Sequence, residues 1–201
     1  MDSSELIIIM KQKHIFYILL AFFTASSKVV FAQNKFCIDI DYHYNLGLSE
    51  KISGNTLKRD FYDLGGNSLH LSTRYRITQE WSAGIGIGLD RYTDPGYNTL
   101  PIFATARYQF IKYIPDFYLF TDLGYAINAG DIFTPGFTGS LGLGYTYYTK
   151  KRFGVNLQIG YNLKTFTNVP HYHLNLATNE ITYSEEEGIR HSLSLGIGIT
   201  F

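Results

Sequence analysis

The end of the chain alternates strictly between apolar residues and polar or small ones. From Ile189 to Phe201 every second residue is large and apolar except His191, and the residues between them are Arg, Ser, Gly or Thr. A period of two residues is that of a β-strand, because successive side chains point to opposite faces. This segment therefore predicts a strand with one apolar face, ending on an aromatic residue.

The same alternation recurs in seven earlier segments, and it is the main signal in the sequence. These expected strands are Phe36–Leu48, Phe61–Ile77, Trp81–Tyr92, Ile102–Phe110, Phe117–Asn128, Phe137–Tyr148 and Phe153–Lys164. Two longer polar stretches, Ser49–Arg59 and Thr165–Gly188, are expected to be loops. The connections alternate between short and long, which is typical of bacterial outer-membrane barrels with short periplasmic turns and longer extracellular loops. The sequence thus predicts an all-β fold, an eight-stranded antiparallel up-and-down transmembrane β-barrel.

Alternation alone does not decide which face of the sheet lies inside. Soluble barrels such as lipocalins use the same period, with the apolar face turned inward around a ligand. Three features favour an apolar outer face: a polar face rich in glycine and opposite charges, aromatic residues near strand ends, and the terminal Phe201. We therefore expect a membrane barrel and keep a lipocalin-like periplasmic binder as the soluble alternative.

The beginning of the chain, residues 1–32, is expected to be a cleaved signal peptide. A basic patch at residues 11–14 precedes an apolar run over residues 15–23, and small residues precede the expected cleavage site. That run is shorter than the roughly 20 residues that a membrane-spanning helix needs. Met10 is a candidate true start because acidic residues precede it. A short membrane anchor is the alternative to a cleaved signal peptide. The mature barrel domain would be residues 33–201.

Composition excludes several classes of function. The formal net charge is zero, whereas a nucleic-acid binder needs a basic surface. The single cysteine, Cys37, excludes an intramolecular disulfide and offers no cysteine-based metal cluster. We expect no cofactor.

The mature chain resembles the small OmpA/OmpX-like outer-membrane β-barrel proteins of the Bacteroidetes type, often labelled porin-family. The residues that carry the resemblance are Leu100–Phe103, Arg107–Tyr108, Asp122–Tyr125 and Gly196–Phe201. The resemblance implies a location in the outer membrane, contact with its lipid, and a carboxy-terminal signal for the barrel-assembly machinery that ends on Phe201. It implies no common catalytic site, since this fold hosts different functions.

Ionisable residues are numerous on the polar faces and form the main candidate site. The expected lumen residues are Asp39, Asp41, His43, His70, Arg74, Arg76, Asp90, Arg107, Asp122 and Arg190. An eight-stranded barrel has an interior that side chains just fill, and an unpaired buried charge is costly. We therefore expect these charges to pair and plug the lumen. A gated polar conduit, a proton-coupled site or a small-solute channel is the functional alternative.

A lipid-modifying enzyme is the competing class of function. His191 lies on the apolar face of the last strand, close to the acidic run Glu185–Glu187, where a histidine of a lipid hydrolase could act. Ser192 and Ser194, however, fall on the opposite face, which is a poor geometry for a nucleophile and its base. We expect an interfacial histidine and no catalytic residues.

His171 and His173 have the spacing of a weak metal-binding pair. No third ligand of certain geometry accompanies them in the sequence, so no metal is expected. The expected function is that of an integral outer-membrane protein with a structural or surface-interaction role in the cell envelope.

Overall fold

The computed structural model describes residues 35–52, 54–60, 62–94, 96–110, 112–130, 133–149, 153–175 and 180–201, without the side chains of residues 168 and 170–184. The expected signal peptide, residues 1–32, lies outside the described residues. Residues Cys37–Phe201 form one compact unit, which contains the barrel. No helix within the described part of the chain is both long and apolar enough to span a bilayer.

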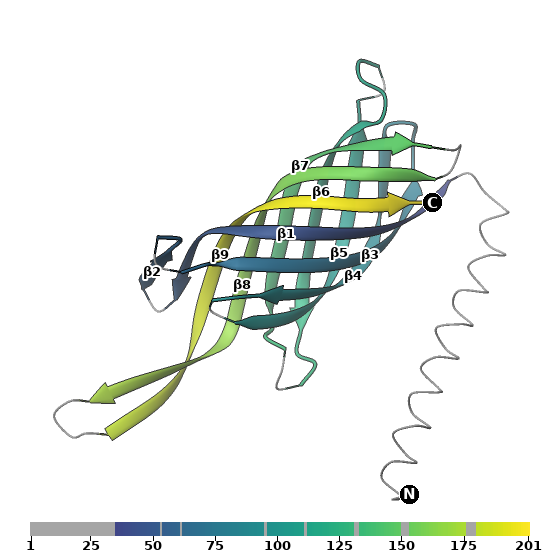
Figure 1. The fold of residues 1–201 in the computed structure, drawn as a ribbon. Coiled ribbons are helices and arrows are strands. Elements are labelled where there is room, and N and C mark those ends of the chain that lie inside the picture. The colour runs from purple at the N-terminus through teal and green to yellow at the C-terminus, as the bar shows by residue number, and fades with distance from the viewer. Residues whose placement is uncertain are drawn as a thin grey trace, which may run out of the picture. The chain divides into compact units, whose positions relative to one another are not determined.

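The barrel consists of antiparallel strands joined in chain order, shown in Figure 1. The strands are β1 (Phe36–Ile52), β2 (Asn55–Lys58), β3 (Gly65–Arg76), β4 (Trp81–Tyr92), β5 (Tyr97–Gln109), β6 (Phe117–Ile127), β7 (Gly136–Tyr148), β8 (Gly154–Asn175) and β9 (Glu180–Thr200). The short β2 folds back on the end of β1, so eight strands form the wall. The predicted eight-stranded barrel is confirmed.

Pairing between the first and last strands closes the sheet. β1 and β9 pair from Asp39 opposite Thr200 to Ile52 opposite Gly188. The backbone of Phe201 extends this pairing, because its N–H donates to the carbonyl of Ile38 at 2.9 Å. Closure leaves no open sheet edge in hydrocarbon, which is the condition for a sheet to cross a bilayer.

The predictions of two loops were wrong in part, because strands run through both segments. β1 continues to Ile52 and is followed by β2, so much of Ser49–Arg59 is a hairpin. β8 and β9 likewise occupy most of Thr165–Gly188. The alternation of the sequence marks where one face meets lipid. It stops at the membrane boundary, whereas hydrogen-bonded strands continue beyond it.

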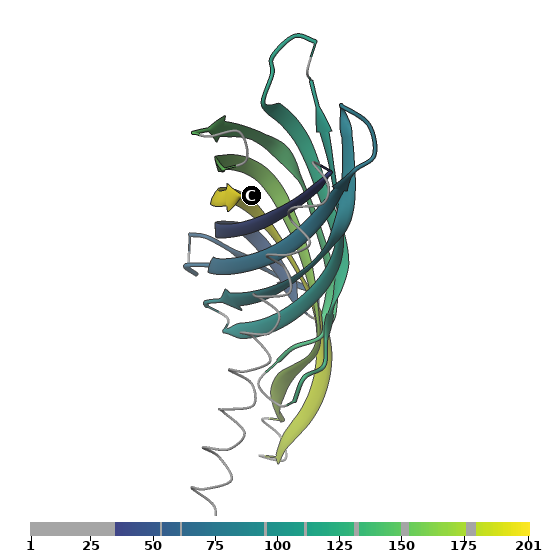
Figure 2. The ribbon, with the colours of Figure 1, turned by 90° about the vertical axis from the view of Figure 1, so that its right-hand side faces the viewer.

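The β8–β9 hairpin extends beyond the other strands as a two-stranded arm (Figures 1 and 2). β8 has 22 residues and β9 has 21, whereas β3 and β4 have 12 each. A strand needs only roughly 9–11 residues to cross the hydrocarbon. The arm leaves the barrel at the end opposite the carboxy terminus, as Figure 1 shows.

The outer face of the wall is apolar and the inner face is polar. Exposed aliphatic residues form a belt that includes Leu69, Leu71, Ile85, Ile87, Leu89, Ile102, Leu123, Leu141, Leu143, Leu157, Ile159, Leu195 and Ile197. Aromatic pairs lie at the carboxy-terminal end, where Phe201 packs edge-on against Phe153, and Trp81 packs at a tilt against Tyr108. This arrangement is that of an outer-membrane barrel, with the apolar face in lipid and aromatic girdles at the interface. The arrangement shows which face of the sheet lies inside, and the alternative of a lipocalin-like barrel with its apolar face turned inward is wrong.

A charge in the middle of this belt should destabilise the barrel, and the same charge outside it should not. Ile159→Arg is expected to lower the free energy of unfolding by about 2–4 kcal/mol in liposomes, since cationic residues at the midplane of a barrel cost about that much. Tyr113→Arg, in the turn between β5 and β6, is the control and should cost about 0–1 kcal/mol. Urea unfolding followed by the fluorescence of the single tryptophan, Trp81, measures both. Equal losses would contradict the lipid-facing belt.

Candidate functional site

The inner face of the barrel carries the charged residues that the sequence predicts. Of the ten expected lumen residues, seven are buried: Asp39, Asp41, His43, Arg74, Asp90, Arg107 and Arg190. The other three, His70, Arg76 and Asp122, are half-buried. They come from alternate positions on β1, β3, β4, β5, β6 and β9, and they are arranged in successive layers along the lumen.

The layer nearest the carboxy-terminal end is a network of two carboxylates and two guanidinium groups. Arg74 binds Asp39 through two parallel hydrogen bonds, from Nε at 2.7 Å and from Nη2 at 3.0 Å. Arg107 bridges the two carboxylates, at 3.3 Å from Asp39 and 3.2 Å from Asp41. Asn156 donates to the other oxygen of Asp41, Oδ1, at 3.1 Å. Each charge in this layer therefore has an opposite charge beside it, as burial requires.

The middle layer is polar, and its described residues form no ion pair with one another. His43 Nε2 and the Gln158 side-chain oxygen lie 2.7 Å apart, and Gln158 donates to the Tyr118 hydroxyl at 3.0 Å. Asp122 forms no ion pair within 4.0 Å with any other residue that the structure describes. Two small spaces of about 10 Å³ each border this layer, and Asp122 lines both.

The next layer centres on one carboxylate with three partners. Lys164 Nζ lies 2.6 Å from Asp90 Oδ2, and His70 Nε2 lies 2.8 Å from Oδ1. The hydroxyl of Thr99 donates to the same carboxylate at 3.2 Å. Lys164 is fully buried, so its charge depends on Asp90 for compensation.

The layer nearest the arm is an ion pair between Arg190 and Glu50, both fully buried. The guanidinium Nη1 also donates to two backbone carbonyls, Gly65 at 3.2 Å and Thr93 at 3.3 Å. Arg190 is thus tied to three other strands or connections, which fixes its position across the lumen.

Aromatic rings surround this outermost ion pair. The Arg190 guanidinium lies 5.2 Å from the ring centre of Tyr92, 5.9 Å from Phe166 and 6.0 Å from Tyr97. Tyr97 and Phe166 stack with their centres 4.3 Å apart, and Val169 packs in the same cluster. The rings exclude water from the ion pair and add cation–π attraction.

Sequence reasoning missed two members of the lumen network, Glu50 and Lys164. Lys164 continues the inward alternation of β8 after Asn162, and this signal was available. Glu50 was hidden because a bulge between Gly47 and Ser49 shifts the register of β1 against β9. One extra residue reverses which side chains face inward. Arg76 makes no ion pair with another described residue, so the network does not include it.

The structure places the histidine considered for catalysis on the outer face. His191 Nδ1 is hydrogen-bonded with the hydroxyl of Tyr161, at the arm-side end of the lipid belt. Ser192 and Ser194 are buried on the lumen face, as the alternation predicts. Neither Ser192 nor Ser194 therefore lies on the face of β9 that carries His191.

The candidate metal pair is only partly described. The backbones of His171 and His173 lie in β8 opposite Ser184 and Thr182 of β9, and their side chains are outside the described set. Among the described residues, no group of three or more His, Cys, Asp or Glu is placed to hold a metal ion.

Removing one partner from the buried network should cost more than removing an exposed one. Asp39→Asn leaves Arg74 and Arg107 without their shared carboxylate, and a broken buried ion pair costs about 3–5 kcal/mol. Asp63→Asn is the control, because its pair with Arg59 is solvent-exposed at 4.0 Å and such pairs contribute about 0–1 kcal/mol. Urea unfolding in liposomes compares the two variants. Similar losses would show that the lumen charges are well hydrated.

Comparison with known proteins gives likenesses of fold only. No family model matches the chain, and no curated protein matches its sequence. Three similar solved structures are the outer membrane protein AlkL in DMPC bilayers (12% identity, TM-score 0.45, 84% of this chain and 90% of that chain), OprG from Pseudomonas aeruginosa (13%, 0.43, 83% and 96%) and Neisserial surface protein A (15%, 0.42, 82% and 95%). The closed sheet, the apolar outer face and the charged lumen carry the conclusion that this chain is an outer-membrane β-barrel.

Proposed function

We propose that this barrel has no intrinsic catalysis, that its charged lumen is plugged, and that its role is structural or one of surface interaction. The observation that supports this proposal is the layering of the ion pairs across the lumen. Two of the spaces between the layers measure about 10 Å³ each, which is about enough for one water molecule. A continuous wet path would require the ion pairs to separate.

The end of the barrel that carries the arm is the part that would interact with a partner at the cell surface. The β1–β2 hairpin and the β8–β9 arm extend there, and the start of β1 and the end of β9 lie at the other end. In outer-membrane barrels the short turns face the periplasm and the longer connections face outward. The arm is therefore the part offered to an external partner.

Two other functions would need features that differ from those described. A lipid-modifying enzyme would need a nucleophile beside His191, whose described hydrogen-bond partner is the Tyr161 hydroxyl. A small-solute channel would need the pairs of Arg107 and Lys164 to open. Neither requirement has a supporting observation in the described part of the barrel.

The proposal includes the finer expectations from the sequence. These are export by the signal peptide of residues 1–32, recognition of the Phe201 end by the barrel-assembly machinery, and kinship with the OmpA/OmpX-like porin-family proteins of the Bacteroidetes type. Phe201 is half-exposed at the barrel end, which leaves its ring accessible to an assembly factor.

Conductance tests the plug. The folded protein in planar lipid bilayers is expected to give no stepwise current in concentrated potassium chloride. Arg190→Ala removes only the outermost layer, so it should also stay closed, because the Asp90 and Asp39 layers remain. Steady conductance steps from the wild-type protein would contradict the plug. Steps from Arg190→Ala alone would show that the deeper layers do not seal the lumen.

Epitope insertion tests which end faces outward. An epitope inserted directly after Asn175, the last residue of β8, is expected to bind antibody on intact cells. The same epitope inserted at Gln79, in the turn between β3 and β4, is the control and should be labelled only after the cells are broken. Reversed labelling would overturn the proposed orientation.

A further inference from the structure

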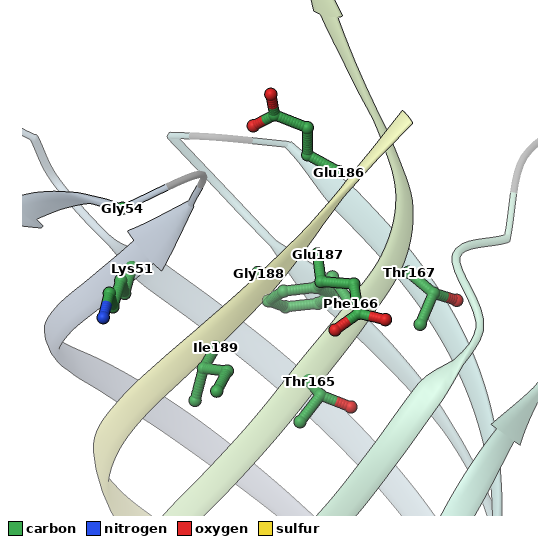
Figure 3. Close-up of a pocket in the computed structure, with 9 residues that line it drawn as sticks. All are labelled: Lys51, Gly54, Thr165, Phe166, Thr167, Glu186, Glu187, Gly188 and Ile189. Carbon is green, nitrogen blue, oxygen red and sulfur yellow. The ribbon is translucent and has the colours of Figure 1, made fainter. Parts of the chain in front are cut away.

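A groove opens on the outer face of the barrel where the β8–β9 arm leaves the wall (Figure 3). It has a volume of about 550 Å³, and its lining includes Lys51, Thr165, Glu187 and Ile189. These residues come from the three neighbouring strands β1, β8 and β9. The lining also includes Glu186 and Phe166, and Phe166 is one of the rings around Arg190, so the groove adjoins the arm-side end of the lumen network.

The strand register places the groove directly beside the lipid belt. Ile189 pairs with Thr165 of β8 on one side and with Lys51 of β1 on the other. Figure 3 shows Ile189 between the other two. The next outward-facing residue on β9, toward the membrane, is His191, which is hydrogen-bonded with Tyr161. The apolar outer face begins beyond His191. The groove therefore lies at the level of lipid headgroups on the arm side.

The bulge in β1 accounts for the charge in this groove. The shift between Gly47 and Ser49 turns Glu50 into the lumen, where it pairs with Arg190, and leaves Lys51 on the outer face. Lys51 is exposed and forms no ion pair with any residue that the structure describes. The buried cations of the lumen, in contrast, are paired with carboxylates. A cation is thus available at the boundary between lipid and water.

The lining also contains groups that could contact sugar hydroxyl groups and apolar atoms of a ligand. Glu187 is exposed, lies two residues from Ile189 on the same strand, and can accept hydrogen bonds from hydroxyl groups. Ile189 is 40% exposed and provides an apolar contact between the charged positions. A plain anionic headgroup would match Lys51 but would leave the carboxylate of Glu187 without a complementary group.

We propose that this groove binds the headgroup of a phosphorylated glycolipid of the outer leaflet. A phosphate lies at Lys51, sugar hydroxyls lie at Glu187, and the acyl chains follow the apolar belt toward Ile159 and Leu195. The site is continuous with the lipid-facing surface, which is why a membrane lipid is the occupant. This inference rests on the outer-membrane placement and is independent of whether the lumen is plugged.

Native mass spectrometry of the detergent-purified, folded protein tests the proposal. The probes are lipid A with its phosphates, the same lipid after dephosphorylation, and phosphatidylglycerol. Wild-type protein is expected to retain phosphorylated lipid A and to lose about fivefold in affinity when the phosphates are removed, the effect of one cationic residue near an anionic lipid. Equal retention of both forms of lipid A would overturn the proposal without any variant.

Three variants assign the effect to the groove. Lys51→Gln should lower the affinity for phosphorylated lipid A about fivefold. Lys51→Arg keeps the charge and should bind like the wild type, and Lys112→Gln, in the turn at the other end, is the matched control. Equal binding by Lys51→Gln and the wild type would overturn the site.

Phosphatidylglycerol separates the two kinds of anionic lipid. It is expected to bind more weakly than lipid A, and Glu187→Gln should weaken only lipid A. Equal binding of both lipids, with the same dependence on Lys51, would overturn the glycolipid assignment in favour of a simple anionic phospholipid. Conductance of the wild-type protein would overturn the plug and leave these outcomes unchanged.

Discussion

The pairing of β1 with β9 is the constraint on which the rest of this structure depends. A sheet that crosses lipid must pair all its backbone groups, so its first and last strands must meet. Closing eight strands leaves an interior just wide enough for side chains. The inward residues must then fill that space, and the charged ones must compensate one another because they lie away from bulk water. The layered ion pairs are the consequence of this closure.

The outward residues follow from the same closure. Once the polar face is enclosed, the apolar face must lie in lipid, and the belt of leucine and isoleucine residues does so. The bulge after Gly47 links the two faces at the arm end. It supplies Glu50 to the inner ion pair with Arg190 and Lys51 to the outer groove. A single inserted residue therefore shapes both the plug and the lipid-facing site.

The sequence predicted the wall of the barrel well, because alternation directly records which residues face lipid. Trp81–Tyr92 was predicted with the bounds of β4, and seven of the ten expected lumen residues are buried. Three things escaped prediction for physical reasons. Outside the membrane both faces of a strand meet water, so the arm carries no alternation to mark it. A bulge reverses the alternation locally, which concealed Glu50, and no periodic pattern reveals which lumen charges will pair.

Heat-modifiability in SDS is the most direct test of the closed membrane barrel. The protein from an outer-membrane fraction would be run in SDS with and without boiling. The unheated protein should migrate as a compact species and shift on boiling, because a closed barrel resists SDS until its strands separate. A protein that is released with the soluble periplasmic fraction and shows no shift would contradict the account.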